Sequence, residues 1–185
     1  QIRKNLYGED HSVNAFLYTK LGTQYNLVDK LDQALDAFQN SIRILKKQGI
    51  KDMDLAVAYK GLALVLEKSG KDEESLLYFK RALKVFKDND INDSPELADC
   101  YHELGVLYKK LGRYNESVKN LLEDLKISEK ALPESGEDVA RSYLALCEAY
   151  FGLKDYDKAL KYAKKSLELG NKVFGRDSPH CVDTI

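Results

Sequence analysis

The feature that most constrains this chain is an internal repeat of about 42 residues, marked by four tyrosines. Tyr18, Tyr59, Tyr101 and Tyr143 follow one another at spacings of 41, 42 and 42 residues. Each tyrosine is followed three residues later by Leu and then by a small residue. Repeats near this length bury their apolar faces only by stacking on one another. The register therefore predicts a solenoid that presents a binding surface, and argues against an enzyme.

Within each repeat, the apolar and small residues recur at steps of three and four, which is typical of amphipathic helices. We therefore expect an all-α solenoid of four helix-turn-helix units. The expected units are residues 13–50, 54–92, 95–134 and 137–175. The expected helices are 13–26, 30–47, 54–68, 71–87, 95–111, 114–130, 137–152 and 156–173.

The turns inside the units keep the same register. Gly70 and Gly112 separate the two helices of the second and third units. A glycine at such a place ends a helix at little cost, because it adopts a positive φ freely. In the first and fourth units the same place is held by Val28-Asp29 and Lys154-Asp155, without glycine.

The two ends of the chain resemble each other. Residues 8–13 and 175–180 share a Gly-x-Asp-x-x pattern and lie 167 residues apart, close to four repeats. We therefore expect one solenoid over residues 1–185, with partial units at 1–7 and 178–185, cut from a longer protein. Solenoids need caps at their ends. Uncapped ends predict end-to-end self-association, because apolar surface is exposed there.

Composition removes several classes of function. The net charge is −1, so no global electrostatic force drives the chain toward nucleic acid or an anionic membrane. No apolar run approaches the roughly 20 residues of a membrane span. The three cysteines have no paired short spacing, which favours a reducing compartment. We expect a cytoplasmic chain with no nucleic-acid partner and no membrane insertion.

Two motifs begin like metal sites and fail. His102-Glu103 opens a zinc-protease helix pattern, but Val106 stands where the second histidine is needed. The acidic stretch 88–93 resembles a calcium loop, but Asp93 occupies the position that needs glycine. We therefore expect no catalytic residue, no metal and no cofactor.

The repeated positions resemble the tetratricopeptide repeat over residues 8–175. That motif places a large aromatic, Leu-Gly and Tyr in the first helix, and Ala, an aromatic and Ala in the second. The first unit matches with Tyr18, Leu21-Gly22, Tyr25, Ala34 and Phe38, and the third with Tyr101, Leu104-Gly105 and Tyr108. Units two and four depart, with Ala63 and Cys147 at the glycine position. The resemblance implies a right-handed solenoid.

The usual tetratricopeptide unit has about 34 residues. The longer unit here resembles the repeats of kinesin light chains and similar cytoplasmic adaptors, which recruit protein cargo. Those proteins carry an Asn pair just before the Leu, whereas the first unit here has Thr19-Lys20. The carboxylate clamp of chaperone-binding repeats is not matched either, because Asp99 and Glu103 would repel a carboxylate.

The resemblance implies that the first helix of each unit lines a concave groove. By helical period, the outward residues mix apolar side chains with charges of both signs, which suits an extended peptide or an amphipathic helix with apolar anchors. The alternative is that the apolar ones pack against a neighbouring helix. The candidate peptide-binding residues are Phe16, Thr19, Thr23, Asn26, Val57, Lys60, Leu64, Glu67, Asp99, His102, Val106, Lys109, Arg141, Leu144, Glu148 and Phe151.

Three functions fit the sequence. The first is a non-catalytic scaffold or adaptor that binds a protein or peptide segment in the groove. The second is a peptide-sensing regulator, since some bacterial signal receptors use long tetratricopeptide repeats. The third is the substrate-docking arm of a larger enzyme.

Overall fold

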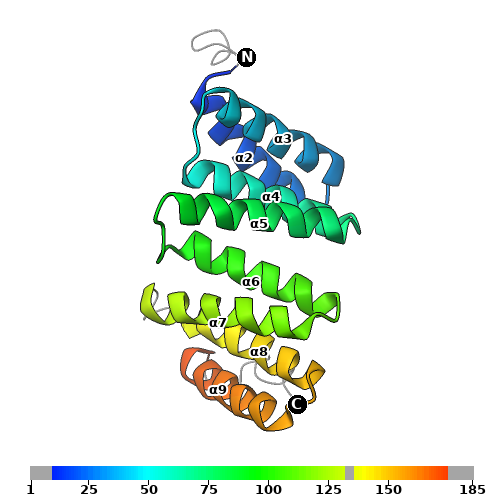
Figure 1. The fold of residues 1–185 in the computed structure, drawn as a ribbon, viewed down its shortest axis with the longest axis vertical. Coiled ribbons are helices and arrows are strands. Elements are labelled where there is room, and N and C mark those ends of the chain that lie inside the picture. Colours follow the sequence, from blue (N-terminus) through cyan, green and yellow to red (C-terminus); the bar gives the residue numbers. More distant parts are fainter. Residues whose placement is uncertain (1–9, 132–135, 175–185) are drawn as a thin grey trace. The chain divides into compact units, whose positions relative to one another are not determined.

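The computed structural model describes residues 10–131 and 136–174, and every regular element in that part of the chain is a helix (Figure 1). The helices form four antiparallel hairpins, which confirms the all-α prediction. They are α2 (Ser12–Leu27) with α3 (Leu31–Lys47), α4 (Met53–Lys68) with α5 (Asp72–Asp88), α6 (Pro95–Lys110) with α7 (Tyr114–Ala131), and α8 (Gly136–Gly152) with α9 (Tyr156–Phe174). The expected partial units at 1–7 and 178–185 lie outside the described residues.

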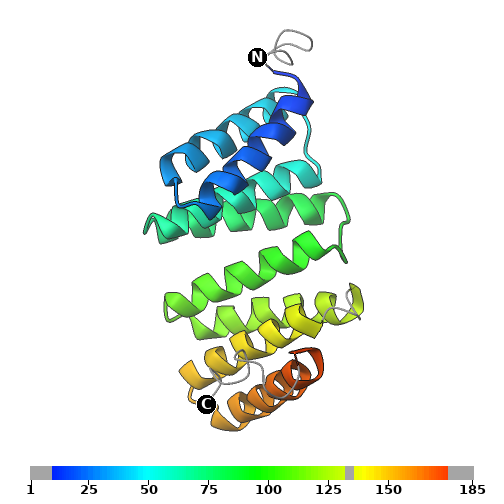
Figure 2. The ribbon, with the colours of Figure 1, turned by 180° about the vertical axis from the view of Figure 1, so that it is seen from behind.

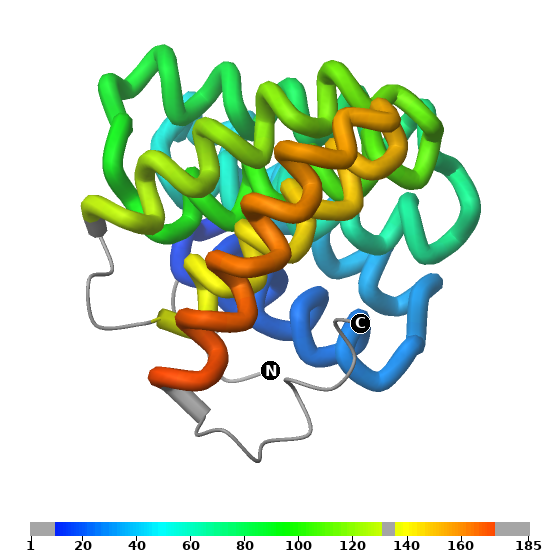
Figure 3. Tube along the Cα trace, turned by 90° about the horizontal axis from the view of Figure 1, so that it is seen from below, coloured from blue at the N-terminus to red at the C-terminus, as the bar shows by residue number. Residues whose placement is uncertain are grey.

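The chain divides into two compact units, residues 1–91 and 92–185, each of which contains two hairpins. In the first, α3 packs against both α2 and α4, and α2 also contacts α4 (Figure 2). In the second, α7 packs against both α6 and α8, and α9 runs alongside α8 (Figure 3). The first helices of neighbouring repeats, α2 with α4 and α6 with α8, therefore lie side by side within each unit.

The four hairpin turns close in the same way. In each turn, the backbone carbonyl of the last tyrosine or leucine of the motif accepts a hydrogen bond from the N–H group five residues later in the chain. In the first turn, Lys30 N–H donates to Tyr25 O at 2.9 Å. This is the Schellman bond that ends a helix, and it requires a left-handed residue just before the donor. Gly70 and Gly112 take φ of 75° and 70°, as predicted. In the other two turns, Asp29 and Lys154 adopt φ of 54° and 60° although they carry side chains.

The beginning of α6 is set by its sequence. The Ser94 Oγ accepts the backbone N–H of Leu97 at 3.1 Å, and Pro95 occupies the first helical position. A serine cap satisfies a donor that the helix leaves unpaired, and proline lacks the N–H that would otherwise be unpaired there.

The core of the first unit is built around Phe38. Its ring lies between Gly22 of α2 and Gly61 of α4, and is almost fully buried. A Cβ built at Gly61 would lie 2.2 Å from the ring Cε1 atom, and one at Gly22 would lie 2.9 Å from the ring. The two glycines therefore let helices from two successive repeats approach the same ring.

The core of the second unit gathers the aromatic and aliphatic residues of α7, α8 and α9. Leu121, Leu146 and Ala149 are fully buried, and the ring of Tyr150 stacks on that of Tyr162 at 5.5 Å between centroids. Leu121 packs on Gly105, where a Cβ would meet the Leu121 Cγ at 2.7 Å. Within the described chain, no helix is both long enough and apolar enough to cross a membrane.

Candidate functional site

The candidate surface of the first unit is formed by α2 and α4. Phe16 is 50% exposed near the start of α2, and the ammonium of Lys20 lies 5.3 Å from its ring centroid. Thr23 is exposed. The other five predicted residues at the end of α2 and on α4 are half-buried: Asn26, Val57, Lys60, Leu64 and Glu67. This surface thus offers one large apolar side chain beside a partly covered strip.

Charges across the candidate surface of the second unit are paired between α6 and α8. Arg141 of α8 lies 3.5 Å from Asp99 and 3.9 Å from Glu103, both on α6. Lys109 of α6 forms an ion pair with Glu148 of α8. Glu103 was not among the predicted residues, because the helical period alone did not place it opposite Arg141.

Apolar side chains lie between these ion pairs along the two helices. Val106 follows Glu103 on α6, and Leu144 follows Arg141 on α8; both are half-buried. Phe151, at the end of α8, is 64% exposed and meets Tyr156 edge to face at 5.6 Å. The surface therefore alternates charged pairs with apolar side chains, and its most exposed apolar residue lies at one end.

Two of the predicted residues are instead buried in helix packing. Thr19 shares a 2.7 Å hydrogen bond with Ser41 of α3, between their hydroxyl oxygens. His102 is only 4% exposed and faces α7. Each first helix is covered on more than one side by its neighbours, so these two side chains are corrected from surface positions to interior ones. Partner contact by the other fourteen stays a prediction.

His102 belongs to a buried polar network that joins three helices. Its Nδ1 lies 2.9 Å from the Asp124 Oδ2 of α7, and because a carboxylate only accepts, His102 donates. Ser142 of α8 donates to the same oxygen at 2.7 Å, and Ser128 donates to Asp124 Oδ1 at 3.0 Å. Asp124 is 2% exposed. No spacing in the sequence indicates this network, because His102 and Ser142 lie 22 and 18 residues from Asp124.

The network is no hydrolytic triad. Ser142 shares its one hydroxyl proton between the Asp124 carboxylate and the Asp138 carbonyl, at 2.7 and 2.9 Å, whereas the serine of a triad donates to a histidine nitrogen. The arrangement ties α6, α7 and α8 together.

Comparison with known proteins identifies the repeats. A family model described as tetratricopeptide repeat matches residues 12–88 and 54–130, and a second with the same description matches 139–180. The protein KINESIN LIGHT CHAIN-RELATED 3 of Arabidopsis thaliana is 30% identical over 90 residues. That match covers 48% of this chain and 14% of the relative, so the chain spans a small part of that protein's length.

Two solved structures share the fold. BtubC (BKLC) from P. vanneervenii has a TM-score of 0.81 at 20% identity, covering 89% of this chain and 66% of that one. The apo form of RapI has a TM-score of 0.76 at 19% identity, covering 86% and 56%. These neighbours are built of helix-turn-helix repeats, which confirms the solenoid class, and the kinesin light chain-related protein confirms that resemblance. The chain belongs to the tetratricopeptide repeat family.

Proposed function

We propose that this chain is a non-catalytic scaffold or adaptor module that binds a peptide or helix of a protein partner on its first helices. Tetratricopeptide repeats are in general protein–protein interaction modules, which supports this proposal. The observation that carries it is the exposure of two aromatic side chains on first helices, Phe16 of α2 at 50% and Phe151 of α8 at 64%. Large aromatic anchors of this kind supply much of the energy of protein interfaces. A cytoplasmic location remains part of the proposal.

The charge pattern of the second unit suits a partner with apolar anchors. Arg141 and Lys109 already have carboxylate partners on the facing helix, so a ligand charge would have to compete with them. Exposed ion pairs contribute little to affinity, typically up to about 1 kcal/mol. Binding energy would come from side chains seated on Val106, Leu144 and Phe151, with the ion pairs setting register.

This pairing makes charge reversal of Arg141 a poor test. A glutamate there would face Asp99, Glu103 and Asp138, which all lie within 4 Å of the present guanidinium. Repulsion between four carboxylates would disturb the packing of α6 and α8 as well as any partner. A test should therefore change exposed apolar side chains that hold no ion pair.

The sharper experiment replaces Phe16 and Phe151 by serine and compares partner capture from native lysate with the unmodified chain. The matched control replaces Leu77 of α5 and Leu122 of α7 by serine. Both are exposed apolar residues on second helices, one in each unit. We expect the first pair to lose the captured partners, the control pair to keep them, and circular dichroism to show equal helicity. Equal capture by both variants would refute binding on the first helices.

A further inference from the structure

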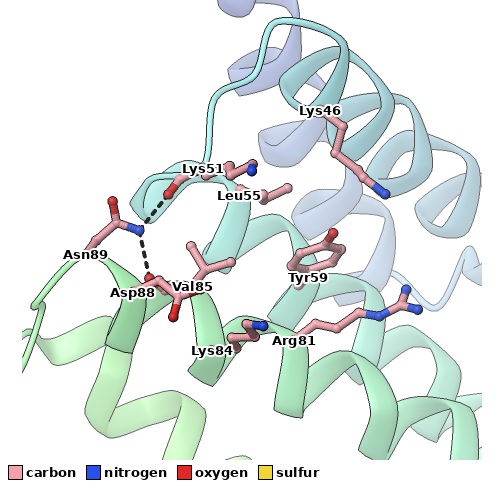
Figure 4. A pocket seen from close by; sticks show the side chains of 9 residues that line it. All are labelled: Lys46, Lys51, Leu55, Tyr59, Arg81, Lys84, Val85, Asp88 and Asn89. Carbon is pink, nitrogen blue, oxygen red and sulfur yellow. Dashed lines mark hydrogen bonds between the residues drawn. The ribbon is translucent and has the colours of Figure 1, made fainter.

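A pocket of about 670 Å³ lies in the first unit, between α3, α4 and α5 (Figure 4). None of its lining residues belongs to the proposed peptide surface. It is formed where α3 and α5 diverge on either side of α4. The residues that line it are Lys46, Lys51, Leu55, Tyr59, Arg81, Lys84, Val85, Asp88 and Asn89.

The lining carries four positive charges and one negative charge in a chain whose net charge is −1. Lys46, Lys51, Lys84 and Arg81 form no ion pair with any residue in the described part of the chain. The neighbours of Lys46 on α3 behave differently: Arg43 and Lys47 pair with Asp10 at 2.6 and 2.5 Å. The pocket therefore concentrates cations that the fold itself leaves uncompensated.

Helix ends account for part of this pattern only. Lys46 lies in the last turn of α3, where a cation favours the helix dipole. Arg81 lies about two turns before the end of α5, beyond the reach of that effect, and Lys51 precedes α4. The helix dipole therefore does not account for these two cations.

The walls add apolar contact and a hydroxyl. Leu55 and Tyr59 are buried, and burial raises the pKa of Tyr59 above its ordinary value, so the phenol stays protonated. The guanidinium of Arg81 lies 4.9 Å from the centroid of the Tyr78 ring, which in turn lies 5.8 Å from that of Tyr59. Stacking holds the guanidinium in place before any ligand arrives, which lowers the entropy cost of binding.

We propose that this pocket binds a small ligand carrying at least two phosphate groups. One phosphate monoester carries about −1.5 to −2 at neutral pH, so two are needed to balance a lining with three excess positive charges. The volume lies within the roughly 300–1,000 Å³ of small-molecule sites. Arg81 offers a fork that suits phosphate oxygens, and the lysines act as point charges. Asp88 and Asn89 lie at one end (Figure 4), so the anion belongs at the end with Lys84, Arg81 and Lys46.

The test titrates the full 185-residue chain with pyrophosphate and with inositol hexakisphosphate, at constant ionic strength, by isothermal calorimetry. The pocket variant is Arg81→Gln with Lys84→Gln. The matched control is Lys80→Gln with Lys87→Gln, which removes the same charge from exposed positions of the same helix outside the pocket. We expect the pocket variant to bind at least about tenfold more weakly and the control to stay within about twofold.

Amide NMR shifts should place the bound anion beside Tyr59 and Lys84, at the end of the pocket away from Asp88 and Asn89. Equal losses in both variants would show non-specific attraction and overturn the proposal, as would a lack of binding at millimolar probe. A doubly phosphorylated peptide, or vesicles containing a bisphosphorylated inositol lipid, serves as the comparison. Binding to either of these without binding to the soluble polyphosphates would assign the pocket to a macromolecular partner and also overturn it. Both proposals can fail separately, because Phe16→Ser and Phe151→Ser leave the pocket intact.

Discussion

Replacing Asp124 by alanine should destabilise the second unit more than any other single change in its polar interior. The carboxylate accepts from His102, Ser142 and Ser128 at 2.9, 2.7 and 3.0 Å, and joins α6, α7 and α8. After truncation, Ser142 keeps its bond to the Asp138 carbonyl. His102 and Ser128, both buried, would lose the acceptor that the structure gives them.

The size of the effect follows from these two stranded donors. Each buried polar group left without a partner costs about 1–3 kcal/mol, and His102 and Ser128 are two such groups. We therefore expect Asp124→Ala to lower the free energy of unfolding by about 3–5 kcal/mol. Asp124→Asn keeps the shape and one acceptor oxygen, and its amide can donate to Ser128, so its loss should be about 1–2 kcal/mol.

Amide hydrogen exchange measures the loss of stability within the second unit itself. The amides of Leu104 and Leu146, in the buried core, should lose protection by about 100-fold or more in Asp124→Ala, from a loss of roughly 3 kcal/mol. As a control, Ser75→Ala removes one buried bond, Ser75 Oγ to Ala63 O at 2.8 Å, and should cost about 1 kcal/mol. A loss below about 1 kcal/mol for Asp124→Ala, or equal losses for alanine and asparagine, would refute this account of the network.

Two further predictions concern packing and pH. Gly61→Ala should destabilise the first unit by about 1–3 kcal/mol in a denaturant titration, because the added Cβ lies 2.2 Å from the buried Phe38 ring. If Phe38→Leu, added to Gly61→Ala, does not recover part of that loss, the clash with the ring is not its cause. Burial, followed by a 2.6 Å hydrogen bond to Glu129, raises the pKa of Tyr143 above its ordinary value of 10.0. Tyr143 therefore contributes stability that is fully present below about pH 10 and is lost as the pH rises toward the folded-state pKa. Thermal unfolding at pH 9 and pH 11 should therefore show a smaller alkaline loss for Tyr143→Phe than for the unmodified chain, and identical losses would contradict this role.

The helix boundaries could be predicted closely because capping and turn residues next to each boundary determine them. The expected helix 71–87 is Asp72–Asp88 in the structure, and 95–111 is Pro95–Lys110. Gly70 ends one helix through its positive φ, and Ser94-Pro95 begins another through a cap. Phe38, at the aromatic position of the repeat motif, is buried. Such signals involve residues close together in the chain, so a single sequence contains them.

The side-chain environment could not be predicted in the same way. Thr19 and His102 appeared on the outward face by helical period, but each first helix is packed on several sides, and both are buried. The partner of His102 lies 22 residues away on another helix, and polar pairs at that distance have no recognisable spacing. The ion pairs of Arg141 likewise depend on how α8 lies against α6.

The basic pocket was missed for a related reason. Lys46 and Lys47 lie in the last turn of α3, where the helix dipole alone favours cations. The pairing of Lys47 with Asp10, and the convergence of Lys46 with Lys51, Lys84 and Arg81, require three helices to be in place. Basic residues of this kind are common on helical surfaces, and they form a site only where the fold brings several of them together.

The ring of Phe38, which both Gly22 and Gly61 contact, limits how the repeats can be exchanged. One repeat later, the position of Gly61 is held by Glu103, and two repeats later by Ala145. A chimaera that joined the α2–α3 hairpin directly to either of those hairpins would place a side chain where the ring must lie. Although the four repeats descend from one pattern, the first two form a matched pair that shuffling or duplication of single repeats would separate.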